Sequence, residues 1–349
     1  MTSRSGFDAL ILVSFGGPER MDDVIPFLEN VLRGKNVPPE RMAAVAKHYE
    51  RFGGISPINQ QNRDLIAAIE SRFAIDGPDM PVYWGNRNWH PMLADTLSQM
   101  SDDGIERALA FVTSAYGSYS GCRQYLENID NAGKVAAERG KNPPAIKKLR
   151  VYFNHPGFIE ANADNLRIAL EKISPHRRGR VRVLFSAHSI PMAMADGCLY
   201  EKQLKETAAL VAKAAAAEKY EIENYEIENY EVVYQSRSGP PSQPWLEPDV
   251  LDRMRELAGT GEDTFVIQPI GFISDHMEVK FDLDIQASEL AEELGVELVR
   301  AATVGTHPAF IDLIRQLVLE ELEGAEKLSL GELGLLPEQC QTGCCPSGR

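Results

Sequence analysis

The sequence lacks the strongest motifs for nucleotide binding and for serine hydrolysis. No G-x-G-x-x-G follows its first apolar run, and no G-x-x-x-x-G-K-[ST] occurs anywhere in its 349 residues. The nucleophile motif G-x-S-x-G is absent as well. These absences remove the best signals for a dinucleotide-binding fold, a nucleoside-triphosphatase and an α/β-hydrolase.

Cysteine and long apolar runs are also scarce. The five cysteines are an odd number, and no apolar run approaches the roughly 20 residues of a membrane span. The short N-terminal apolar run ends at Gly16-Gly17-Pro18 and favours a first strand over a signal peptide. We therefore expect no transmembrane segment, and a reducing, cytoplasmic location in which thiols stay free or bind metal.

Positive charge is the third deficit. Lys and Arg number 36 against 51 Asp and Glu, so the net charge is −15. Such a chain repels nucleic acid and anionic membranes, and we expect neither as a partner.

Short apolar runs alternate with longer helical patterns along the whole chain. This alternation predicts parallel βαβ units with helices on both faces of each sheet. We expect eight strands in two α/β lobes of four, at residues 1–160 and 161–325, and a cysteine-containing tail at 326–349. An eight-stranded barrel is disfavoured because two or three helices follow the first strand. The strands are expected at Ala9–Ser14, Val82–Gly85, Ala108–Ser114, Leu149–Phe153, Val181–Ser186, Glu231–Gln235, Thr264–Gly271 and Val296–Ala302.

His188 stands where the fifth predicted strand ends, just before Pro191. Ligands of open α/β sheets bind beyond the carboxyl ends of the strands. A histidine there can exchange protons near neutral pH, although a structural hydrogen bond explains it equally well from this residue alone.

Carboxylates gather after the seventh predicted strand. Glu278, Asp282 and Gln286 recur at four-residue spacing on a predicted helix, with Asp275 and His276 just before them. Acids at a helix N-terminus are ordinary. Histidines and carboxylates at adjoining strand ends would also suit a divalent cation held loosely, in transit.

Polar turns follow other strands. Ser114–Gly121 and Ser236–Pro241 offer hydroxyls, backbone N–H groups and Arg237, which could bind the carboxylates of a large ligand. Ser56 is expected to cap the helix that follows it. A tandem YEIEN at 220–229 is interpreted as a local duplication in a surface connection.

Three cysteines, Cys340, Cys344 and Cys345, lie in the tail. An iron–sulfur cluster held by cysteine alone needs a fourth thiolate, which Cys122 could supply if the tail folds back. Cys198 would then not be a ligand. The alternative to a cluster is an exposed tail with free thiols.

Five segments together resemble the ferrochelatase family, and within it the actinobacterial coproporphyrin III enzymes. They span nearly the whole chain in the family's order: LVSFGGPE (12–19), GGISPIN (53–59), FSAHSIP (185–191), YQSRSGPPSQPWLEPDV (234–250) and PIGFISDHMEVKFDLD (269–284). The resemblance implies two flavodoxin-like lobes with a tetrapyrrole between them.

The resemblance also implies roles for single residues. His188 matches the histidine that accepts pyrrole protons or takes part in metal delivery, and Glu278 matches the glutamate that faces it across the macrocycle. Asp282 continues the acidic relay, and Asp275 and His276 match positions that support Glu278. The matches for propionate contacts are Ser56 and Tyr125, with Tyr119 competing for the latter.

The chain departs from the family in places. Phe15 stands where many members have a tyrosine that can ligate iron, and Gln286 replaces a frequent carboxylate. No apolar membrane lip is present. The cluster ligands would be Cys122, Cys340, Cys344 and Cys345, holding a [2Fe–2S] cluster, although their spacing differs from that of the animal enzymes.

The predicted function is insertion of Fe²⁺ into coproporphyrin III in haem biosynthesis. Protoporphyrin IX is the alternative substrate, and a non-catalytic haem or iron–sulfur sensor is the alternative of another class. Other haem-pathway enzymes would be transient partners. Arg33 or Arg237 could hold propionates.

Overall fold

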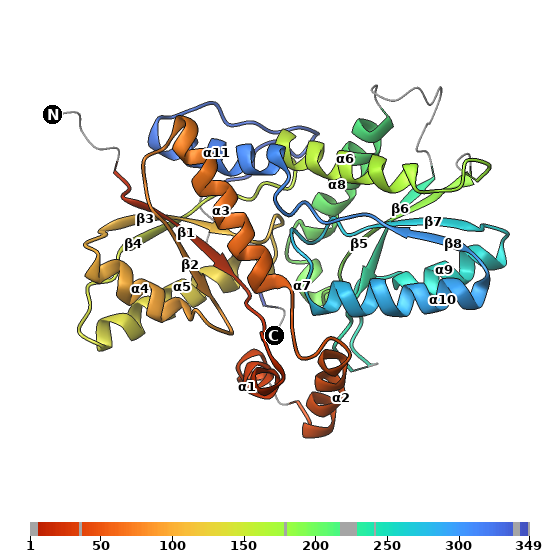
Figure 1. Ribbon diagram of the computed structural model, residues 1–349, viewed down its shortest axis with the longest axis horizontal. Coiled ribbons are helices and arrows are strands. Elements are labelled where there is room, and N and C mark those ends of the chain that lie inside the picture. Colours follow the sequence, from red (N-terminus) through yellow and green to blue (C-terminus); the bar gives the residue numbers. More distant parts are fainter. Residues whose placement is uncertain are drawn as a thin grey trace.

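A computed structural model of the chain describes residues 6–34, 37–177, 180–216, 229–240, 242–337 and 343–347. Two four-stranded sheets, all parallel, form its two halves (Figure 1). This confirms the predicted fold class. Most of the tandem YEIEN lies outside the described residues.

The first sheet has the strand order β2-β1-β3-β4 and the second the order β6-β5-β7-β8. Their central strands β1, β3, β5 and β7 are almost entirely buried, as expected for parallel strands covered on both faces. The strands are β1 (Ala9–Ser14), β2 (Val82–Asn86), β3 (Arg107–Val112), β4 (Ala145–Lys148), β5 (Arg182–His188), β6 (Tyr230–Gln235), β7 (Thr264–Gln268) and β8 (Glu297–Arg300).

One predicted strand is wrong. The apolar run Leu149–Phe153 is not a strand; β4 is the preceding Ala145–Lys148, at the sheet edge. Leu149, Tyr152 and Phe153 are buried as loop residues. Edge strands tolerate lysines, and an apolar run can reach the core without strand pairing, so hydrophobicity pointed to the wrong segment.

Helices cover both faces of each sheet, and in the described part of the chain two helical segments are π-helices. One π-helix, η1, leads into α5, and the other, η3, leads into α10. The helices are α1 (Met21–Leu32), α2 (Pro39–Glu50), α3 (Ile58–Asp76), α4 (Leu93–Asp102), η1 (Tyr119–Arg123), α5 (Gln124–Glu138), α6 (Pro156–Glu171), α7 (Met192–Ala195), α8 (Tyr200–Ala216), α9 (Val250–Gly259), η3 (Val279–Ala287), α10 (Ser288–Leu294) and α11 (Pro308–Leu322). Among the described residues, none of these helices is long and apolar enough to cross a membrane.

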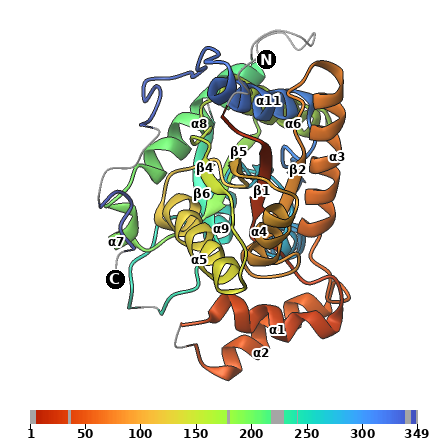
Figure 2. The same ribbon diagram turned by 90° about the vertical axis from the view of Figure 1, so that its left-hand side faces the viewer.

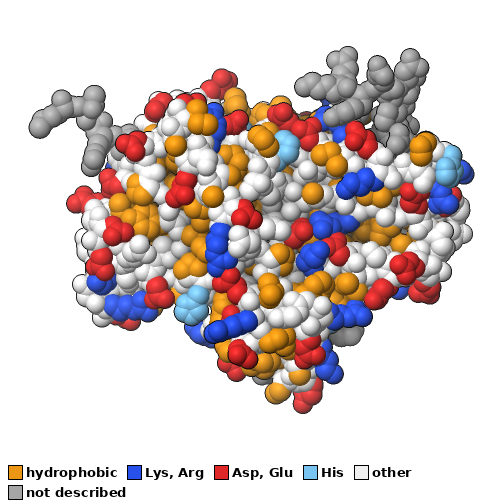
Figure 3. All heavy atoms as spheres, in the orientation of Figure 1, with side chains coloured by type: hydrophobic (Ala, Val, Ile, Leu, Met, Phe, Trp, Pro, Cys, Tyr) orange, Lys and Arg blue, Asp and Glu red, His pale blue; other side chains and the backbone are white. Residues whose placement is uncertain are grey.

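Helices α1 and α2 project below the two sheets as a separate pair (Figures 1 and 2). Their apolar faces meet in a small cluster that includes Phe27, Tyr49 and Met277. Met277 belongs to the second half of the chain, so this cluster joins the halves. Acidic and basic side chains are interspersed over the face in Figure 3, with hydrophobic side chains at the projecting end.

Candidate active site at the strand ends

His188 is the last residue of β5, as the sequence predicted. Its Nδ1 lies 2.5 Å from the carbonyl oxygen of Ser189, and a carbonyl can only accept. Nδ1 therefore carries a proton, which leaves Nε2 as the atom that gains or loses one. The hydroxyl of Tyr200 donates to the His188 carbonyl at 3.0 Å and fixes the backbone there. The side chain is 32% exposed, so Nε2 is within reach of a ligand.

Glu278 lies directly against His188 and not across a macrocycle from it, as the resemblance implied, because the gap between the two side chains is too narrow to hold a flat ring. Its Oε2 lies 3.6 Å from His188 Nε2, and about half of its side chain is exposed. Burial alone would lower the pKa of His188, but Glu278, the Ser189 carbonyl and Asp282 together raise it to about 8. His188 therefore becomes neutral, and able to accept a proton at Nε2, as the pH rises through about 8.

Asp282 lies one step further along η3. Its Oδ2 accepts hydrogen bonds from Ser236 Oγ at 2.5 Å and from Gln235 Nε2 at 3.3 Å. Burial raises the pKa of Asp282 to about 6, with Glu278 adding to the rise and the Ser236 hydroxyl opposing it. Two groups that titrate near neutrality thus stand beside one carboxylate, which is a common arrangement at functional sites.

The helix predicted after the seventh strand is present. Over Val279–Ala287 its backbone forms a π-helix, a type found often at functional sites. Ser236 has a φ of 61°, in the left-handed region, and its hydroxyl is bonded to Asp282. The predicted ligand-binding rim at Ser236–Pro241 therefore uses its first hydroxyl to hold a carboxylate of the protein itself.

Arg300, the last residue of β8, ties this segment together. Its Nη1 and Nη2 each lie 3.1 Å from an oxygen of Asp275, and its Nε lies 2.6 Å from Asp284. The backbone N–H of Asp275 donates to Gln61 Oε1 from the first half, at 2.8 Å. Both ends of the segment that carries Glu278 are thereby anchored.

His276 lies behind Glu278 rather than beside the reacting space. Its Nδ1 accepts from the backbone N–H of Glu278 at 3.2 Å, and its ring packs on Phe272. Burial lowers its pKa, although the Glu278 carboxylate opposes that effect. A neutral His276 supports the Glu278 backbone, a contact consistent with the supporting position that the sequence assigned to it.

In the first half of the chain, the residues just after β1 and β2 include aromatic and basic groups. The guanidinium of Arg87 lies 4.4 Å from the ring centre of Tyr125 and 5.5 Å from that of Phe15. Tyr125 is 5% exposed. Tyr119 donates to Glu127 at 2.9 Å.

Ser56 does not cap a helix, contrary to the sequence prediction. Helix α3 begins at Ile58 after Pro57, and no side chain caps it. Ser56 is 4% exposed and lies beneath Gly17, where an added Cβ would come within 2.8 Å of its Oγ. Its backbone N–H donates to Pro18. The turn is therefore held by backbone contacts.

The described cysteines gather without forming a metal site. Cys344 Sγ and Cys345 Sγ are 3.5 Å apart, and the pKa of Cys345 is raised by burial first and then by Cys344, Cys198 and Cys122. Arg123 donates to the Cys344 carbonyl at 3.2 Å, which places the tail against η1. Within the described ranges, no three His, Cys, Asp or Glu side chains converge as metal ligands, and Cys340 lies outside those ranges.

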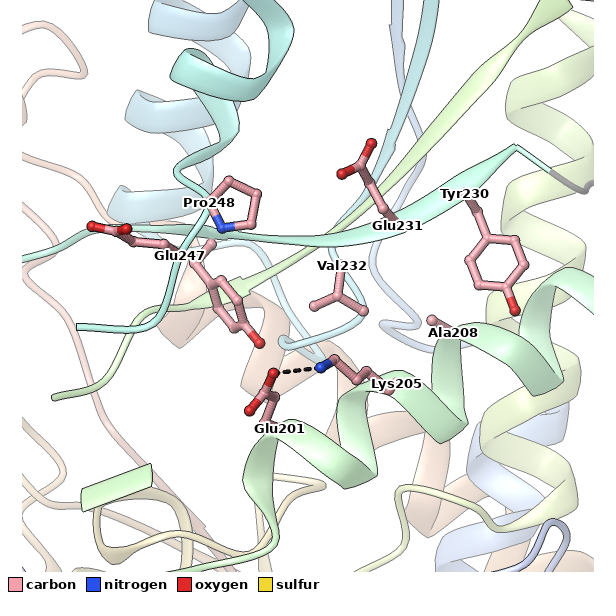
Figure 4. A pocket seen from close by; sticks show the side chains of 9 residues that line it. Glu201, Lys205, Ala208, Tyr230, Glu231, Val232, Glu247 and Pro248 are labelled. Carbon is pink, nitrogen blue, oxygen red and sulfur yellow. Dashed lines mark hydrogen bonds and ion pairs between the residues drawn. The ribbon is translucent and has the colours of Figure 1, made fainter. Parts of the chain in front are cut away.

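A cavity of about 420 Å³ lies elsewhere, between α8 and the edge strand β6. Figure 4 shows the Glu201–Lys205 ion pair on one side of it and Tyr230 on another. It contains neither His188 nor Glu278. It does not belong to the candidate site.

The paired groups His188 and Glu278 can hold a cation briefly and exchange protons with a bound ligand. The sequence motifs found both residues. They missed Arg300, Gln61 and Arg87, which stand alone in their segments. Only the rule that ligands bind at strand ends could have drawn attention to Arg87 and Arg300.

The chain was then compared with known proteins. The family model described as Ferrochelatase matches residues 7–322. A ferrochelatase of Rhodopirellula baltica is 55% identical and covers 99% of this chain and 95% of its own. A coproporphyrin III ferrochelatase of Nocardia farcinica is 48% identical, and the match covers 98% of this chain and 97% of that protein. Among solved structures, SirB from Bacillus subtilis with Fe³⁺ has a TM-score of 0.52 at 11% identity, covering 91% and 96%, which is a likeness of fold.

Proposed function

Because this chain belongs to the ferrochelatase family, we propose that it inserts Fe²⁺ into coproporphyrin III and releases two protons. Relatives named coproporphyrin III ferrochelatases from Nocardia farcinica and Streptomyces coelicolor, at 48% and 47% identity over nearly the full chain, support this substrate. The soluble porphyrin with four propionates also suits a chain without a membrane-spanning helix among its described residues.

The observation that carries the proposal is the His188–Glu278 pair, 3.6 Å apart and open to a ligand. As Fe²⁺ binds the four ring nitrogens, the two pyrrole N–H groups must lose their protons. Neutral His188 accepts one at Nε2, which is its only free ring nitrogen. The carboxylate of Glu278 accepts the other and passes it to Asp282, whose pKa of about 6 suits a relay to water.

The propionates would be held by groups of the first half of the chain. We propose Tyr125 and Tyr119 for this role, and Ser56 through the turn that it stabilises. Arg237 is a weaker candidate, because its guanidinium donates to the carbonyls of its own loop.

Anaerobic assay of Fe²⁺ insertion with coproporphyrin III and with protoporphyrin IX tests the function. We expect turnover with a clear preference for coproporphyrin III, and a loss of at least about 100-fold in His188→Ala. A preference for protoporphyrin would identify the alternative enzyme. A coloured protein that turns over neither porphyrin would favour the haem or iron–sulfur sensor.

We also propose a [2Fe–2S] cluster held by Cys122, Cys340, Cys344 and Cys345, with no step of the reaction passing through it. The tail packed on η1 supports it, whereas the described thiols would have to move to meet one cluster. Anaerobically purified protein should then be brown, and Cys345→Ser colourless. A colourless, active wild-type protein would contradict the cluster alone. Thiol ligands of this kind also support a cytoplasmic location, where transient contacts with other haem-pathway enzymes are proposed.

A further inference from the structure

Arg87 is a partly buried arginine without a carboxylate partner among the described residues. No ion pair joins it to Asp or Glu in the described ranges, and its Nε is fully buried without a hydrogen-bond partner. Arginines of neighbouring segments are paired, such as Arg63 with Glu19 and Arg123 with Glu127. A buried donor left unpaired is unfavourable unless a ligand satisfies it.

The surroundings of Arg87 orient its guanidinium. The rings of Tyr125 and Phe15 lie 4.4 and 5.5 Å from it. An arginine that stacks on an aromatic ring keeps its N–H donors in the guanidinium plane, where they match the two oxygens of a carboxylate. The group is therefore prepared for a planar anion.

Arg87 also lies toward the proposed reaction centre. It directly follows β2, and its backbone N–H donates to the Ser14 carbonyl at the end of β1. Phe15 packs edge-on against Phe27 at 6.2 Å, and the cluster of Phe27 includes Met277, the neighbour of Glu278. Phe15 is 36% exposed and offers an apolar surface to a flat ring.

We propose that Arg87 binds a propionate that coproporphyrin III has and protoporphyrin IX lacks, and so sets the substrate preference. This inference rests on the proposed function and deepens it. The analogue with a vinyl group at that position leaves the guanidinium unpaired in an aromatic setting. A site built for a charged group rejects such an analogue more strongly than an apolar site rejects an added group.

Binding of both free-base porphyrins, followed by quenching of protein fluorescence without iron, tests the inference. We expect Arg87→Met to weaken the binding of coproporphyrin III about 10- to 100-fold and to change the affinity for protoporphyrin IX by less than about threefold. Arg87→Lys keeps the charge and loses the planar fork, so its affinity for coproporphyrin III should lie between those of the wild type and Arg87→Met. The matched control is Arg107→Met, because Arg107 also lies over a ring, that of Phe7 at 4.6 Å, but at the start of β3.

The outcomes separate the two proposals. If Arg87→Met weakens both porphyrins equally, or neither, while the wild type still inserts Fe²⁺, the inference is wrong and the function stands. If the wild type binds neither porphyrin, both are wrong. If Arg87→Met does not fold, Arg87→Lys is tested in its place, and the inference requires that it weaken coproporphyrin III binding more than protoporphyrin IX binding.

Discussion

The two halves of the molecule use one strand order for two different tasks. In each sheet the first strand of the half is central, the second lies on one side of it, and the third and fourth lie on the other. A π-helix follows β3 in the first half and β7 in the second. The strand ends then diverge: β5 ends in His188, while β1 ends in Ser14 with Phe15 after it, and Ser236 follows β6, while Arg87 follows β2. The fold supplies the place, and single residues at strand ends supply the chemistry.

The second half therefore pairs its polar groups with one another, whereas the first leaves a cation stacked on aromatic rings. His188, Glu278 and Asp282 influence each other's charge. Among the described residues, the guanidinium of Arg87 contacts the rings of Tyr125 and Phe15 and pairs with no carboxylate. The contrast supports our proposal that one half carries the proton and metal chemistry and the other recognises the macrocycle.

The largest effect on kcat should appear when His188, at the end of β5, and Phe15, just after β1, are each replaced by alanine in separate variants. His188→Ala removes the proton acceptor and should lower kcat about 100- to 10,000-fold. Phe15→Ala removes only contact area and should raise KM for the porphyrin with kcat within about threefold. Steady-state kinetics of the two variants measure this, and comparable losses of kcat in both would break the division of tasks.

A smaller loss is expected from loosening the anchor of Glu278. Arg300→Lys gives up the fork that holds Asp275 and Asp284, and should lower kcat about 10-fold with little change in porphyrin KM. Arg182→Lys is the matched control, since Arg182 is equally exposed and pairs with Glu262 at the opposite end of the second sheet. Equal kinetics of the two variants would show that Arg300 serves stability only.

The pH dependence should shift with the charge of Glu278. The folded-state pKa of His188, about 8, lies above its ordinary value of 6.5, so neutral His188 accumulates as pH rises through 8. The kcat/KM for porphyrin should rise over the same range. Glu278→Gln removes the main charge that raises this pKa, and the residual activity should rise at lower pH, nearer 6.5.

Glu289→Gln provides the control for that shift. Glu289 is exposed and pairs with Arg51, and it does not contribute to the pKa of His188. Its pH profile should match that of the wild type. A profile of Glu278→Gln that also matches the wild type would mean that another group controls the rate.

The smallest expected effects are on the free energy of unfolding, and they should differ in sign between a glycine of the second half and a glycine of the first. An added Cβ at Gly271 would lie 2.6 Å from Ala187 Cα, beside His188, so Gly271→Ala should destabilise by about 1–3 kcal/mol. Gly133 lies inside α5 with nothing within 4 Å of an added Cβ. Gly133→Ala should stabilise by about 0.5–1 kcal/mol without loss of rate. Denaturant unfolding measures both, and a stabilised Gly271→Ala would contradict the packing.

Local sequence predicted much of this architecture. Hydrophobic runs located seven of the strands. The fourth strand was wrong because Leu149 and Phe153 enter the core as a loop, which periodicity cannot distinguish from a buried strand. The helix type of Val279–Ala287 could not be predicted, because a four-residue spacing is compatible with α- and π-helices alike.

The sequence by itself determined the fold class and singled out His188 and Glu278 as candidates, since strand ends and motifs are local features of the chain. Only the tertiary structure decided what these residues touch. Arg300 meets Asp275 because β8 lies beside β7, and Arg87 meets Tyr125 because α5 packs near the end of β2. Such partners lie tens of residues apart, and the pKa of His188 depends on charges that the packing of η3 against β5 brings close. Electrostatic interactions follow distance in space rather than in sequence.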